Sequence, residues 1–141
     1  MQLAAAQVVE ALAARVAPMP SLASPLQTTR EDGVTPVDLP AAWLWGDDES
    51  AELASTEGIH QVQLDGVLRL IVADAEHLDD AMNTAAAEAM ALLFAAPAPY
   101  GLEWTGTRRV PATRGAVRCG EISINWRATY HVDPAAPDVL L

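Results

Sequence analysis

The stretch EISINWRATYHV, Glu121–Val132, decides the fold because its side chains alternate between apolar and polar without a break. The apolar positions are Ile122, Ile124, Trp126, Ala128, Tyr130 and Val132. A period of two is typical of a β-strand with one covered face and one polar face. The sequence therefore predicts a sheet that other elements cover on one side only.

A second alternating stretch, Ile59–Ala73, predicts another strand of the same sheet. It contains Asp65-Gly66, a pair that is common in two-residue hairpin turns. A tight turn at this pair would place the glutamines before it on the same face as the leucines after it. We therefore favour one continuous strand, with Gly66 on its inner face.

Two stretches show the three- and four-residue spacing of apolar side chains that indicates an amphipathic helix. The first, Gln2–Val16, is rich in alanine and is followed by two prolines. The second, Leu78–Phe94, begins with Asp79 and Asp80, whose carboxylates suit the positive end of a helix dipole. Both helices are predicted to pack on the covered face of the sheet.

Two shorter strands, Ala41–Trp45 and Leu102–Thr107, complete the predicted sheet. Residues 46–52 are interpreted as an acidic loop, and residues 105–120 as an arginine-rich loop or the tip of a long hairpin. We expect an α+β fold in a single domain, residues 1–141, with the order α-β-β-α-β-β. Its sheet is mostly antiparallel, and its two helices pack on one face.

Two proline-bearing segments lie outside these elements. Residues 17–40 hold five of the ten prolines and are interpreted as an extended arm that contacts a partner, with room for a short strand near Leu26–Arg30. Residues 133–141 hold two more prolines and are predicted to form a loose tail.

The charge of the chain excludes a general nucleic-acid binder. Nineteen acidic residues face eight basic ones, all of them arginine, for a net charge of −11. Proteins that neutralise phosphates need the opposite balance. The lone Cys119 excludes an intramolecular disulfide, and no apolar run reaches the 18 to 20 or so residues of a membrane-spanning helix. We expect a soluble protein that does not bind membranes.

The sequence contains no phosphate-binding loop, dinucleotide fingerprint, nucleophile elbow or zinc-protease motif. Its three histidines are scattered, and its acidic clusters fit a solvated loop and a helix first turn. We therefore predict no catalytic, cofactor-binding or metal-binding residue and no enzyme activity. The rival hypothesis, a small metal-dependent enzyme or ligand-binding domain, requires a pocket in which carboxylates converge.

Charge and tryptophan both indicate candidate subunit interfaces. Four arginines lie between residues 108 and 118 without an acid, whereas residues 1–100 carry 15 acids and three arginines. The arginine stretch is either a solvated hairpin tip or a contact with the acidic surface of a neighbouring copy. Trp and Arg are also enriched at interface cores. The candidate interface residues are Arg108, Arg109, Arg114, Trp43 and Trp45.

The layout resembles the tail terminator proteins of phages with long non-contractile tails. The resemblance covers residues 3–134 or so and rests on the order of the elements. Its motifs are LAAAQVVEALAARV before a proline-rich arm, then LPAAWLWGDDE, VLRLIVADAE leading into LDDAMNTAAAEAMALLF, GLEWTGTRRV and the closing ISINWRATYHV. Neck and head-completion proteins of the same virions are similar, and composition does not separate them from terminators.

The resemblance implies a hexameric ring in the virion, at the head-proximal end of the tail, assembled in the host cytoplasm. The partners would be the tail tube protein and the head–tail connector, with no cofactor, and genome DNA would pass through the ring. A negative lumen would let DNA slide, because phosphate binding needs cations. The expected channel-facing residues are Asp47, Asp48, Glu49 and Glu52.

Overall fold

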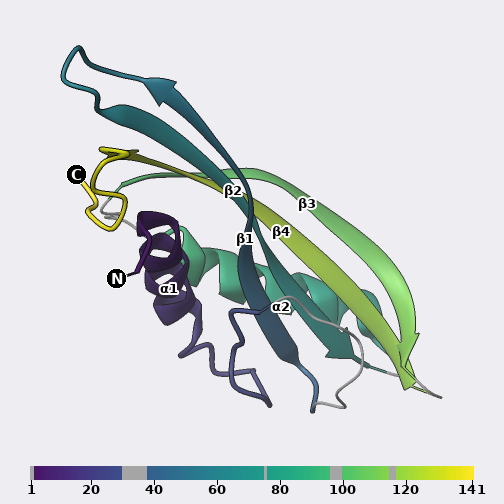
Figure 1. The fold of residues 1–141 in the computed structure, drawn as a ribbon. Coiled ribbons are helices and arrows are strands. Elements are labelled where there is room, and N and C mark those ends of the chain that lie inside the picture. The colour runs from purple at the N-terminus through teal and green to yellow at the C-terminus, as the bar shows by residue number, and fades with distance from the viewer. Residues whose placement is uncertain (1, 30–37, 75, 96–99, 115–116) are drawn as a thin grey trace.

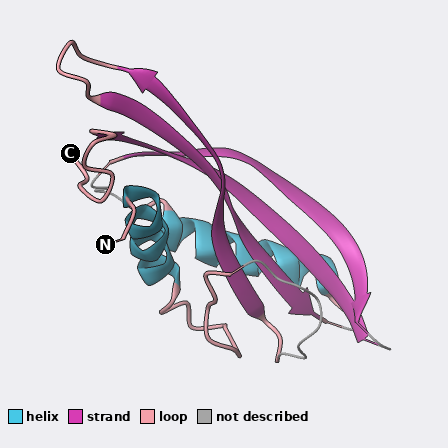
Figure 2. Cartoon of the chain, viewed as in Figure 1, coloured by secondary structure: helices cyan, strands magenta, loops and turns pink. Residues whose placement is uncertain are grey.

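The structure is a computed structural model that describes residues 2–29, 38–74, 76–95, 100–114 and 117–141. Its elements are α1 (Ala4–Val16), β1 (Ala41–Leu53), β2 (His60–Ala73), α2 (Leu78–Leu93), β3 (Gly101–Arg114) and β4 (Val117–Val132). Both helices lie on the same side of one sheet (Figures 1 and 2). The predicted α+β class and the order α-β-β-α-β-β are therefore confirmed.

The four strands form one antiparallel sheet in the order β1-β2-β4-β3. The pair His60 and Val132 marks one end of the central strands, and the pair Ala73 and Cys119 marks the other. The β1–β2 hairpin projects beyond the helices at the first end (Figure 1). The far end of β3 and the start of β4 lie at the opposite end.

The long strand β2 is continuous through Asp65-Gly66, as the alternation predicts. Gly66 lies opposite Trp126 of β4, and the indole of Trp126 occupies the space above Gly66. A Cβ atom on Gly66 would lie 2.1 Å from an atom of the indole. Gly66 therefore serves packing, since only a residue without a side chain admits a buried tryptophan at this point of the sheet.

The helices cover the middle of the sheet with small and branched side chains. α1 buries Val8, Leu12 and Val16, while α2 presents an alanine-rich side that includes Ala89. α2 packs against β4 and β2, where the side chain of Met82 lies over Gly120. A small second cluster of Ala41, Trp43, Ile71 and Cys119 lies on the sheet face opposite the helices.

Two predicted loops are strands in the structure. The acidic run after Trp45 belongs to β1, which continues to Leu53 with a bulge between Gly46 and Asp48. The arginine-rich segment belongs to the β3–β4 hairpin, with a bulge between Trp104 and Gly106. The prediction of an acidic loop was wrong, because pairing with β2 provides this polar segment with backbone hydrogen bonds. For the arginine-rich segment, the structure agrees with the alternative of a long hairpin and not with a loop.

The arm and the tail are tied to the domain where the structure describes them. Gln27 forms a parallel bridge with Trp43 of β1, at the position where the sequence has room for a short strand, and Met19 is buried. In the tail, the Pro137 carbonyl accepts a hydrogen bond from Ala4 and the Leu141 amide donates one to His131. The prediction of a loose tail was therefore wrong.

We expect Gly66→Ala to lower the free energy of unfolding by about 2–3 kcal/mol, because the added Cβ meets a rigid, buried indole. Gly120→Ala is the matched control. Its added Cβ meets the flexible side chain of Met82, which can move aside, so we expect a clearly smaller loss. Urea unfolding of the two variants measures the difference, and equal losses would contradict the packing role of Gly66.

Candidate assembly surfaces

The acidic surface lies on the outer half of β1, beyond the helices. Asp47, Asp48, Glu49 and Glu52 are all exposed there. Asp48 and Glu52 pair with polar residues of β2 and share the open face of the sheet. Glu49 pairs with the buried Leu64 and shares the helix face. Strand alternation therefore divides the predicted channel-facing residues between two faces, and Asp47 occupies the bulge between them.

Glu49 is bonded within its own chain. Its Oε1 accepts a hydrogen bond from the hydroxyl of Tyr130 at 3.1 Å, and Tyr130 is only 2% exposed. Burial raises the pKa of the Tyr130 phenol above its ordinary value, and the nearby Glu49 carboxylate raises it further. The contact fastens the projecting half of β1 to β4 across β2. Sequence analysis missed it because 81 residues separate the partners.

The arginines form a basic surface at the opposite end of the sheet. Arg108 lies on the open face opposite Ser123, and Arg109 lies on the helix face opposite Ile122. Both are exposed, as is Arg118 on the neighbouring strand. Arg114 ends β3, but its side chain lies outside the part of the chain that the structure describes. Acidic and basic surfaces thus occupy opposite ends of one sheet.

The tryptophans differ in exposure. Trp43 is 4% exposed in the single chain because its own chain covers it, which leaves little of its side chain to contact a neighbouring copy. Trp45 is half-buried, with the guanidinium of Arg69 5.4 Å from its ring centroid. Trp104 is 54% exposed on edge strand β3, and its Nε1 donates to Thr107 Oγ1. Trp104 is the exposed tryptophan that the sequence analysis passed over.

The open face of the sheet carries opposite charges on neighbouring strands. Asp65 of β2 lies opposite Arg127 of β4, whose Nε donates to Asp65 Oδ1 at 2.7 Å. This hydrogen bond and the charge of Asp65 raise the pKa of Arg127. Glu103 of β3 lies on the other side of Arg127. Opposite charges therefore alternate across this face, and each is partly accessible to solvent.

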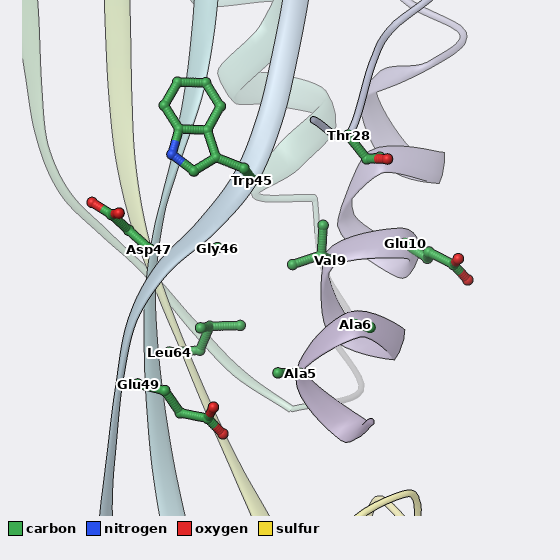
Figure 3. A pocket seen from close by; sticks show the side chains of 10 residues that line it. All are labelled: Ala5, Ala6, Val9, Glu10, Thr28, Trp45, Gly46, Asp47, Glu49 and Leu64. Carbon is green, nitrogen blue, oxygen red and sulfur yellow. The ribbon is translucent and has the colours of Figure 1, made fainter. Parts of the chain in front are cut away.

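A pocket of about 510 Å³ lies between α1 and the bulge of β1 (Figure 3). Ala5, Val9 and Leu64 point into it, whereas Glu10 points to the far side of α1 and Asp47 to the far side of β1. Its carboxylates therefore do not converge on a common point. Among the described residues, no group of three or more His, Cys, Asp or Glu side chains is placed to hold a metal ion.

The sequence matches no protein-family model and no curated protein. No helix in the described part of the chain is long and apolar enough to cross a membrane.

We expect the burial of Tyr130 and its contact with Glu49 to make the free energy of unfolding depend on pH in the alkaline range. The raised pKa keeps the folded phenol neutral while the unfolded phenol ionises at about pH 10. The stability that the Tyr130 phenol contributes is fully present below that pH. As the pH rises toward the folded pKa, this contribution falls by up to ~1.4 kcal/mol per pH unit.

Tyr130→Phe removes both the ionisable group and the hydrogen bond to Glu49. Unfolding free energies of the two proteins, measured from pH 8 to pH 11 or so, should converge as the pH rises. A constant difference across this range would show that the folded protein does not hold Tyr130 in its neutral form.

Proposed function

We propose that the chain is a structural virion protein that assembles into a six-membered ring at the head-proximal end of a phage tail. The ring ends polymerisation of the tail tube and provides the surface that joins the head connector. Its partners are further copies of itself, the tail tube protein and the connector. Genome DNA passes through it without specific binding.

The observation that carries this proposal is the separation of charge along the sheet. Acidic side chains gather on the projecting half of β1, and Arg108, Arg109 and Arg118 lie at the other end. Two unlike surfaces on one chain favour a heterologous contact between copies, which closes into a ring or continues as a filament. Charge then selects the partner and the register more than it adds affinity.

The distribution of acid also suits a channel for DNA. Asp48 and Glu52 are exposed on the open face of the sheet, with Asp47 at the bulge beside them. Six copies of a chain with a net charge of −11 make a strongly negative ring. Because a protein holds DNA mainly through cations on phosphates, such a lumen lets DNA slide. Glu49 is bonded to Tyr130 and shares the helix face, so it is less suited to line the channel than Asp48 and Glu52.

The purified chain should have the mass of six copies in solution, and electron microscopy of assembled particles should place one ring between tube and head. A chain that stays monomeric and does not bind tail tubes would overturn the proposal. A ring found further toward the head, away from the tube, would assign the chain to the neck instead.

We expect reversal of charge in Arg108→Glu/Arg109→Glu to weaken assembly at least tenfold, since both side chains are exposed and contribute to the basic surface. Analytical ultracentrifugation measures the assembly, and circular dichroism checks that the monomer stays folded. Raising the salt concentration should weaken assembly of the unmodified chain in the same direction.

The matched control is Arg108→Lys/Arg109→Lys, which keeps both charges in place. It should assemble much more strongly than the glutamate variant. Unchanged assembly of the glutamate variant at physiological salt would remove these arginines from the contact.

A further inference from the structure

Among the residues that the structure describes, both edges of the sheet have a stretch of backbone with no partner strand. No strand in the described part of the chain pairs with the outer side of β3. On β1, the Gln27 amide donates to Ala42 O, and the Leu44 amide donates to Gln27 O. These bonds cover the inner half of the β1 edge, and no described residue outside the sheet pairs with its acidic outer half. Such edges are templates for a further strand.

The open stretches match in length and in their boundaries. After its bulge, β1 runs without a register shift from Asp48 to Leu53. After its own bulge, β3 runs regularly from Gly106 to Val110, before Pro111, which has no amide hydrogen to donate. Each edge therefore offers one regular segment of five or six residues, limited by an irregularity.

We propose that the segment Gly106–Val110 of β3 pairs antiparallel with Asp48–Glu52 of β1 in a second copy of this chain, forming one sheet through the ring. This inference rests on the proposed function and names the contact that builds the ring. The strand directions agree with it. Each neighbouring pair in the four-stranded sheet is antiparallel, so β3 and β1 run in opposite directions. When equivalent copies are related by rotation, strand directions therefore keep alternating from one copy to the next.

Charge and apolar exposure select the register. With Arg109 opposite Glu49 on the helix face, Arg108 falls opposite Ser50 on the open face. On that face, Asp48 and Glu52 flank Ser50, so Arg108 lies between two carboxylates. Both arginines therefore meet carboxylates of the second copy. The sheet faces of the two copies remain continuous in this register.

The same register brings together two exposed apolar side chains beyond the paired segment. Trp104 is 54% exposed and Leu53 is 62% exposed in the single chain. They fall opposite each other once the β3 bulge is passed. At the other end, Pro111 falls opposite Asp47, at the β1 bulge, so pairing stops on both strands at the same point. Because the two paired segments lie at opposite ends of the sheet, neighbouring copies are offset along the strand direction. A closed sheet requires such an offset.

Cysteine pairs test the contact in the full-length chain under mild oxidation. Thr107→Cys with Ala51→Cys joins facing positions on the helix face, and Arg108→Cys with Ser50→Cys joins facing positions on the open face. Each combination should give a ladder of covalent species beyond the dimer, because every copy then has two linking edges. The native Cys119 is buried and stays in place.

The matched control combines Thr107→Cys with Ser50→Cys, which lie on opposite faces and should remain largely unlinked. Rings that form without either same-face ladder would overturn the edge pairing and leave the ring function intact. Ladders from a chain that builds no closed ring would instead uphold the pairing and overturn the ring. Single-cysteine variants that dimerise as strongly as the double variants link would show a symmetric contact and overturn the pairing.

Discussion

The pairing of β2 with β4 is the constraint on which the rest of the structure depends. Its register places Gly66 opposite Trp126, and the indole fills the space that a side chain on Gly66 would occupy. A slip of one residue would move every apolar side chain of one strand to the polar face. The pairing therefore orients both central strands, gives α1 and α2 one apolar surface to cover, and leaves β1 and β3 as the edges.

These central strands were also the part of the fold that sequence analysis predicted best. Alternation over Ile59–Ala73 and Glu121–Val132 is a strong signal, because an apolar or polar residue at each position indicates which face of the sheet it occupies. The helix prediction over Leu78–Phe94 agrees with α2 to within one residue at its end. Here local pattern and tertiary packing favour the same state, which is the condition under which sequence reasoning succeeds.

The edge strands and the candidate site were harder to predict, for a physical reason. Asp47 to Glu52 carries acids on both faces, and Arg108 to Arg114 mixes arginine with Val110, Pro111 and Ala112, so neither segment has the alternation that indicates a strand. Their strand conformation comes from long antiparallel partners, β2 and β4, that extend past the helices. The contact of Tyr130 with Glu49 and the coverage of Trp43 likewise depend on residues distant in sequence.

The lack of alternation in the edge strands also bears on function. A projecting strand with acid on both faces gains little from burial in its own chain, although the hydrogen bond between Glu49 and Tyr130 fastens it to β4. Natural sheets block open edges with charge, bulges and proline, and both edges here have such features. Charge blocks pairing only with a like surface, however. With acid on β1 and arginine on β3, the features that prevent like edges from pairing favour pairing between unlike ones.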